Sequence, residues 1–158
     1  LDVPLVNTLN GSFSAAYVQV VDRSLLGAFY TSLFSGLFFV MLPIDAILIT
    51  FLRVNDPLWI IAIFISGYMI SFTLNYYIGY AFADFSKRLI NPKRFYKIKS
   101  QINRFGAIAI LACNFVPFFP AQPLSAILGV FKYNKARFYT FWILGQGTKM
   151  ILLALIFA

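Results

Sequence analysis

Four long apolar stretches limit what this chain can fold into. They cover residues 24–51, 57–83, 106–131 and 138–158, and short polar or basic segments separate them. A helix of about 20 residues crosses the roughly 30 Å hydrocarbon core of a bilayer, so each stretch is long enough to enter a membrane. Only 11% of the residues are charged, against about a quarter in soluble domains. We therefore expect an all-α integral membrane protein with a single membrane domain over residues 1–158.

The four stretches differ in whether proline interrupts them. Residues 57–83 and 138–158 have no internal proline, which predicts two transmembrane helices. The other two stretches contain prolines, which remove backbone donors and clash with the preceding turn, so helix breaks are expected there. Backbone groups freed at membrane depth need cover from protein or water, so both breaks should face the bundle interior. The break residues are Pro43 in the first stretch and Pro117, Pro120 and Pro123 in the third.

Basic residues flank the second broken stretch on both sides. Seven lie between residues 87 and 104, and three follow at Lys132, Lys135 and Arg137. Under the positive-inside rule both flanks are cytoplasmic, which predicts a re-entrant hairpin over residues 105–131. The first broken stretch, residues 24–53, should then be a re-entrant hairpin that enters from the opposite face. Four plain spanning helices with kinks are the alternative.

This order of parts is typical of an inverted repeat, in which two similar halves have opposite orientations in the membrane. The connector interleaves bases with large apolar side chains, as segments at the lipid headgroup level do. Because the bases flank the spans, topology explains the net charge of +8, and nucleic acid is not an expected partner. The predicted parts are an N-terminal segment (1–23), hairpins (24–53 and 105–131), transmembrane helices (57–83 and 138–158) and a basic amphipathic connector (84–104).

One face of the second stretch carries small and polar side chains. Gly67, Ser71, Asn75 and Gly79 recur every fourth residue, so a helix places them on the same side. Small side chains let two backbones approach closely within a membrane. The pattern predicts that this face packs against another helix.

Two charged residues lie inside apolar stretches, where a charge costs about 2.5–3.5 kcal/mol unless it is paired or hydrated. Asp45 either caps a helix that restarts at Ala46 or contacts a headgroup or coupling ion. Lys149 is too far from either end of its stretch to reach the interface. We expect both to share one polar cavity, either as a structural ion pair or with Lys149 binding phosphate. The candidate lining residues are Asn75, Asn114, Gln122 and Gln146.

Catalysis is not expected from these residue types. The chain has no His and no Glu, and Cys113 is the only cysteine. A metal cluster, a Cys/His pair and a Ser-His-Asp triad therefore lack their components. We expect neither a metal nor a cofactor.

Three segments resemble one family: LFFVMLPIDAILI, SGYMISFTLNYYIGYAF and RFGAIAILACNFVPFFPAQPLSAILGVFKYNKARFYTFWILGQGTKMILL. Their order is similar to that of the DedA family, also called the SNARE-associated or VTT-domain family, from about Tyr17 to the end. The resemblance implies two oppositely oriented re-entrant hairpins and lipid translocation. It places Asp45 at the acid of the first hairpin tip, and Lys149 where smaller members often carry a base.

The sequence also departs from this family. Many bacterial members carry an acid where this chain has Leu33, and two arginines where it has Asn114 and Pro120. Those charges are linked in the family to proton-coupled function. Their absence favours passive scrambling or a different headgroup.

The expected function is translocation of phospholipid or polyprenyl phosphate, with membrane lipids bearing phosphate headgroups as partners. A proton- or ion-coupled transporter of a small solute is the alternative, and a scaffold that uses the face of Gly67 and Gly79 is a third class. The expected location is a prokaryotic plasma membrane with basic loop 87–104 in the cytoplasm. A second copy of the chain is a further candidate partner.

Overall fold

Helices make up the regular structure of the residues that the computed structural model describes, which are 23–40, 43–117, 119 and 121–157. Most of the predicted N-terminal segment and the predicted break residue Pro120 lie outside these residues. In chain order the helices are α2 (Leu25–Ser35), α3 (Ile44–Leu52), α4 (Pro57–Ala81), α5 (Ala83–Leu89), α6 (Pro92–Phe115), α7 (Gln122–Val130) and α8 (Lys135–Phe157).

The two stretches without internal proline form the long helices α4 and α8. Within the described residues, these are the two helices long and apolar enough to cross a membrane. Asp56 caps α4 by accepting a hydrogen bond from the Leu58 N–H at 2.9 Å. α8 begins three residues before the predicted boundary, because Asn134 Oδ1 accepts a hydrogen bond from the Arg137 N–H at 3.0 Å.

The first broken stretch consists of two short helices whose outer ends adjoin. Ser24 caps α2 by accepting from the Gly27 N–H, and α3 begins directly after Pro43. Asn55 Nδ2 donates to the Arg23 carbonyl at 3.0 Å, which joins the beginning of α2 to the residues after α3. A continuous helix would hold these two residues roughly 45–50 Å apart. The chain therefore turns back between Ser35, where α2 ends, and Ile44, where α3 begins, so the break starts earlier than the proline at position 43 predicted.

The second broken stretch has a longer first arm than the sequence predicted. α6 runs without interruption across the predicted boundary between connector 84–104 and hairpin 105–131. Its start is fixed by Asn91, whose Oδ1 accepts from the Lys93 N–H, and no proline follows Pro92 until Pro117. The basic connector is therefore α5 together with the first half of α6.

The second arm, α7, returns toward the beginning of α6. The rings of Phe95 in α6 and Phe131 after α7 lie with centroids 5.0 Å apart, so the outer ends of this stretch also adjoin. Pro123 lies in the first turn of α7, where proline is tolerated because its missing N–H would have no helical partner.

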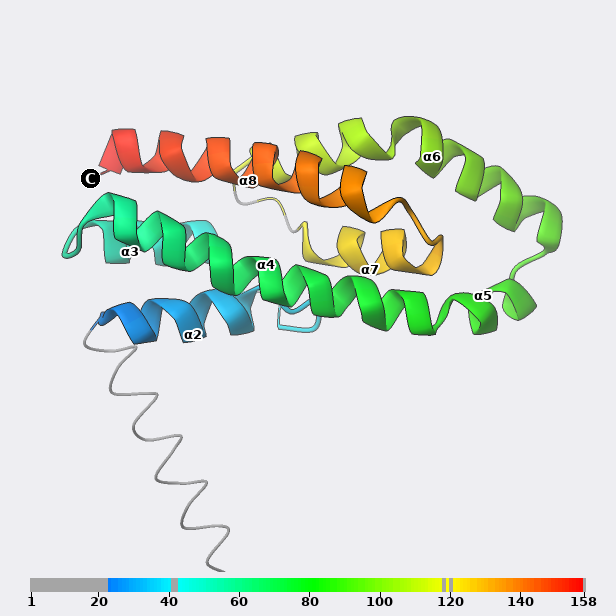
Figure 1. Ribbon diagram of the computed structural model, residues 1–158, viewed down its shortest axis with the longest axis horizontal. Coiled ribbons are helices and arrows are strands. Elements are labelled where there is room, and N and C mark those ends of the chain that lie inside the picture. The colour runs from blue at the N-terminus through cyan, green and yellow to red at the C-terminus, as the bar shows by residue number, and fades with distance from the viewer. Residues whose placement is uncertain (1–22, 41–42, 118, 120, 158) are drawn as a thin grey trace, which may run out of the picture.

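The helices are arranged around α4 (Figure 1). α2 and α7 both pack along α4, and α8 packs on α6 and α3. The outer ends of α2 and α3 lie where α4 begins, whereas those of α6 and α7 lie where α4 ends (Figure 1). The two broken stretches therefore open toward opposite ends of the molecule.

The predicted small-residue face of α4 contacts two helices. A Cβ on Gly67 would lie 2.9 Å from the Phe29 carbonyl of α2, and one on Gly79 would lie 1.9 Å from the Ala126 carbonyl of α7. Gly129 of α7 is equally constrained, because its Cβ would lie 2.0 Å from the Tyr76 carbonyl. The close approach expected of this face occurs, but it is divided between α2 and α7.

Candidate functional site

A buried ion pair joins the first broken stretch to the last helix. Lys149 Nζ in the middle of α8 lies 2.9 Å from Asp45 Oδ1, and each side chain is 3% exposed. Among the described residues this is the one ion pair whose two side chains are both buried. The structure thus brings together the two charges that the sequence predicted to share a cavity.

Asp45 has this position because of where α3 begins. The capping alternative required a helix that restarts at Ala46, but α3 begins at Ile44. Asp45 therefore lies inside the first turn, where the positive end of the helix dipole favours a carboxylate.

A buried ion pair is not explained by stability alone. The cost of removing two charges from water can exceed their mutual attraction, and apolar replacements are often neutral or stabilising. Removing one partner costs about 3–5 kcal/mol, because the other charge is left uncompensated. The charges of Asp45 and Lys149 therefore depend on each other, because either one alone would be buried without a counter-charge.

The buried face of α8 extends the polar site beyond Lys149. Trp142, Gln146 and Lys149 lie four and three residues apart, on the same side of the helix, and all three are buried. Within the described residues, Trp142 Nε1 and both amide atoms of Gln146 have no hydrogen-bond partner. Trp142 was not predicted from the sequence, although its spacing of four residues from Gln146 was the signal that could have identified it.

Asn114 in the last turn of α6 lies against this helix. A Cβ built on Gly145 of α8 would be 3.1 Å from the Asn114 Cβ. Asn114 Nδ2 donates to the Ile110 carbonyl at 2.7 Å, whereas its Oδ1 has no partner among the described residues.

Gln122 connects the two breaks. It is the first residue of α7, and its Nε2 donates to the carbonyl of Ser35, the last residue of α2, at 3.2 Å. Its Oε1 has no hydrogen-bond partner in the described part of the chain. The sequence predicted Gln122 as lining but gave no sign of Ser35.

Asn75 behaves differently from the other predicted lining residues. Its Nδ2 donates to the Gly36 carbonyl at 2.8 Å, and its Oδ1 accepts from the Phe38 N–H at 3.2 Å. Ser71, one turn earlier, donates to the Leu33 carbonyl. These two side chains satisfy backbone groups that the first break frees, so their role is to hold that break against α4.

We use the name orphan amide set for Asn114, Gln122 and Gln146, which are buried and retain unpartnered polar atoms within the described residues. A buried polar atom without a partner costs about 1–3 kcal/mol, so each needs an explanation. Together with the ion pair, the set places donors, acceptors and both signs of charge in the interior of the described part of the chain. No three metal-ligating side chains come together in the residues that the structure describes.

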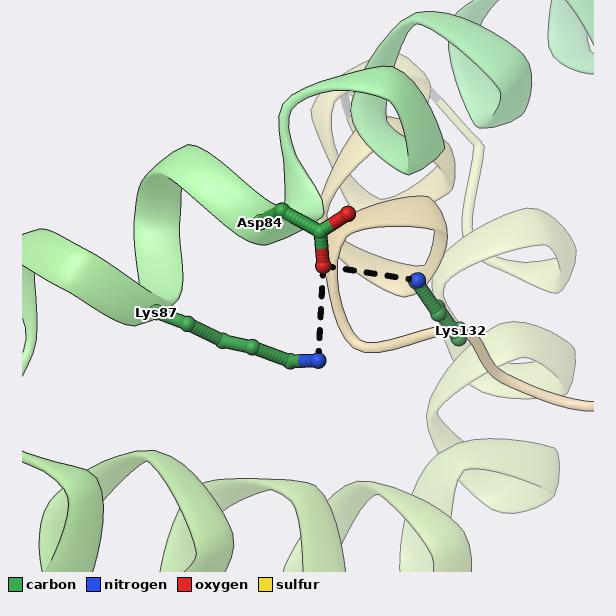
Figure 2. A network of polar contacts seen from close by, with 3 residues as sticks. All are labelled: Asp84, Lys87 and Lys132. Atoms are coloured by element: carbon green, nitrogen blue, oxygen red, sulfur yellow. Dashed lines mark hydrogen bonds and ion pairs between the residues drawn. The ribbon is translucent and has the colours of Figure 1, made fainter.

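A second charged cluster lies near the end of α4, whereas the turn between α3 and α4 lies at its beginning. Figure 2 shows Asp84 of α5 between Lys87 and Lys132, with Oδ1–Nζ distances of 3.4 and 3.6 Å. The positive charge of Lys132, followed by the hydrogen bond from Lys87, lowers the pKa of the exposed Asp84 carboxyl. This cluster links α5 to the loop after α7 and contributes no residue to the ion pair of Asp45 and Lys149.

The chain matches a known protein family. A family model for the VTT domain matches residues 42–158, nearly three quarters of the chain, which include Asp45, Lys149 and the orphan amide set. This confirms the family resemblance predicted from the sequence. Among curated proteins and among solved structures, no match was found.

Proposed function

The chain belongs to the VTT domain family, and from that premise we propose that it is a lipid flippase or scramblase for phospholipid or polyprenyl phosphate. Proteins of this family are membrane-associated and related to transport, and they are not known as enzymes. One observation carries the proposal: Asp45 of α3 forms a buried ion pair with Lys149 of α8, one turn after Gln146 of the orphan amide set. Polar groups placed this way can replace water around a headgroup.

We propose that both broken stretches are re-entrant hairpins that enter the membrane from opposite sides. The support is that each has adjoining outer ends, joined by Arg23 and Asn55 in one case and by Phe95 and Phe131 in the other. The outer ends of α2 and α3 and those of α6 and α7 lie at opposite ends of the described bundle (Figure 1). Charges and freed backbone near the breaks are then covered by protein, as the bilayer requires.

An inverted repeat is supported by the packing of the two halves. The first half consists of the arms α2 and α3 and the long helix α4, and the second half consists of the arms α6 and α7 and the long helix α8. α4 packs on α2, the first arm of its own half, and on α7, the second arm of the other half. In the same way, α8 packs on α6 and on α3. Gly67 and Gly145 both lie ten residues after the first residue of their helix. A Cβ on either would lie 2.9 Å from a carbonyl of the first arm, that of Phe29 or Leu111.

In this proposal the headgroup moves along the buried face of α8 while the acyl chains stay in lipid. Lys149 attracts the phosphate, and the orphan amide set supplies hydrogen bonds that water supplies outside. Because Leu33 and Asn114 replace charged residues found in many bacterial relatives, we propose uncoupled scrambling. The buried carboxylate of Asp45 favours the alternative, an ion-coupled transporter of a small solute.

We further propose that α5 and the first half of α6, which contain basic loop 87–104, face the cytoplasm of a prokaryotic cell. α5 and the first half of α6 carry bases among large apolar side chains, which suits the headgroup level. A second copy of the chain remains a candidate partner in the membrane.

The test is leaflet exchange of labelled phospholipid and of a polyprenyl phosphate in proteoliposomes. Wild type is compared with Asp45→Asn, with Lys149→Ala and with the neutral pair Asp45→Asn/Lys149→Gln, which restores charge balance. Lys87→Ala is the matched control, because it removes an exposed base far from the pair. We expect exchange in wild type and the control, and its loss in the other three. Background exchange for folded wild type, with solute flux driven by pH and abolished by Asp45→Asn, would support the transporter instead.

A further inference from the structure

An apolar groove separates the two arms of the second broken stretch. It has a volume of about 340 Å³, and its walls include Ile98, Ile102, Phe105 and Ala109 of α6 with Leu124 and Ile127 of α7. Phe105 and Ile127 are 52% and 46% exposed, so the groove opens to the outside of the bundle. It shares no lining residue with the ion pair or the orphan amide set. The groove is therefore a separate site.

The helix that forms one wall is strongly basic at its beginning. The first thirteen residues of α6 carry five bases, and the whole helix has no acid. None of the five forms an ion pair within the described residues. Their positive charge is therefore available to an anion. The five bases are Lys93, Arg94, Lys97, Lys99 and Arg104.

The helical register places one of these bases directly beyond the groove. Arg94 precedes Ile98, the first groove residue, by four positions, so it lies on the same face and roughly 6 Å further along α6. Lys93 precedes Ile98 by five positions and is rotated by about 140° away from that face. Gln101 is the polar residue in the lining, one turn inside the groove.

We propose that this groove binds one acyl chain of an anionic phospholipid, with the lipid phosphate held by Arg94. A guanidinium suits a phosphate because it donates two parallel hydrogen bonds. Gln101 lies between Arg94 and the apolar walls, where the glycerol esters of such a lipid would be. The ligand is thus a lipid of the surrounding bilayer bound between α6 and α7, and not the lipid carried past Lys149.

The groove also explains why α6 and α7 pack loosely against each other. α6 and α7 make few contacts with each other, although their outer ends adjoin at Phe95 and Phe131. An acyl chain between them would fill the space that the two arms leave open. We therefore expect the bound lipid to stabilise the arrangement of the second hairpin.

The test is lipid titration of the purified full chain in detergent, followed by native mass spectrometry. The probes are phosphatidylglycerol and phosphatidylcholine with identical acyl chains. We expect one saturable site that prefers phosphatidylglycerol, and about fivefold weaker binding in Arg94→Ala, the effect of one base at an anionic lipid surface. Lys93→Ala removes the same charge from the opposite face, so it is the matched control and should bind as wild type does.

A second variant tests the groove itself. Ala109→Phe should fill it and abolish the saturable site, with an unchanged melting temperature showing that the chain still folds. Equal binding of both lipids, equal effects of Arg94→Ala and Lys93→Ala, or a site that survives Ala109→Phe would each overturn the proposal. So would a dimer that Ala109→Phe dissociates, because a second copy would then occupy the groove. This binding assay involves no leaflet exchange, so failure of the proposed translocation would leave its result unchanged.

Discussion

The two halves of the molecule use buried polar side chains in different ways. In the first half, Asn75 and Ser71 of α4 hydrogen-bond to backbone groups of the first break. In the second half, Gln146 of α8 and Asn114 of α6 keep polar atoms that form no hydrogen bond with a described residue. A buried amide in a membrane helix can thus be a structural clamp or a binding group, and its hydrogen-bond partners distinguish the two.

This difference is informative because the halves are otherwise alike. Gly67 and Gly145 occupy the same position in their helices and make the same close approach to a first arm. Four residues after these glycines, however, α4 carries Ser71 and α8 carries Lys149. At this position the first half has a serine that hydrogen-bonds to the Leu33 carbonyl, whereas the second half has a lysine that pairs with Asp45.

Removing the charge from α8 should have the largest effect. We expect Lys149→Ala to lower the free energy of unfolding by about 3–5 kcal/mol, because Asp45 is left buried without its counter-charge. Asp45→Asn/Lys149→Gln should recover most of this loss. Unfolding by sodium dodecyl sulfate in micelles measures the change. Equal destabilisation by the double variant would show that packing, and not charge balance, dominates at this site.

The clearest test of the comparison exchanges one amide in each half for leucine. Asn75→Leu should cost about 2–4 kcal/mol, because the Gly36 carbonyl and the Phe38 N–H both lose their partner. Gln146→Leu should be neutral or stabilising, because its amide has no partner to lose among the described residues. The same unfolding titration measures both.

Lipid exchange should show the opposite order. Gln146→Leu should slow exchange severalfold, whereas any Asn75→Leu protein that remains folded should keep it. If both variants changed stability and exchange to the same degree, the two halves would not differ in the way described.

Helix packing gives a third, smaller contrast. Gly79→Ala should cost about 1–3 kcal/mol, since its Cβ would overlap the Ala126 backbone carbonyl and force α4 and α7 apart. Gly147→Ala is the control, because nothing lies within 4 Å of a Cβ there. The control should gain up to about 1 kcal/mol from helix propensity. Comparable melting temperatures for the two variants would argue against tight packing of α4 on α7.

The smallest expected effect concerns the exposed cluster at Asp84. Its folded-state pKa is lowered below the ordinary value of 3.8, so its stabilising contribution is present above that value and is lost as pH falls through the folded pKa. Melting temperatures measured from about pH 6 down to pH 2 should decline less in Asp84→Asn than in wild type. High salt should remove the difference, since the charges are exposed.

Much of this architecture could be predicted from the sequence. Proline-free length predicted α4 and α8, and proline placement predicted that residues near Pro43 and Pro117 interrupt the other two stretches. The cost of charge in lipid predicted that Asp45 and Lys149 would face inward.

The rest depended on packing that local patterns do not contain. The boundary at residue 104 was placed where the composition changes, but composition does not end a helix, so α6 continues to Phe115. The spacing of Gly67 and Gly79 indicated close approach without identifying the partners, which are two different helices. Asn75 and Gln146 look equivalent as sequence features, and only their neighbours separate them.

The ion pair also has a consequence for how the protein is made. Asp45 lies near the beginning of the membrane domain and Lys149 near its end, with roughly a hundred residues between them. At about 5–20 residues per second, the ribosome needs on the order of 5–20 s to supply the partner of a carboxylate that has already been synthesised. During that interval the nascent chain must keep Asp45 in contact with water, the insertion machinery or a chaperone. A chain truncated before Lys149 would therefore lack the counter-charge of Asp45, and we expect it to be a target of quality control.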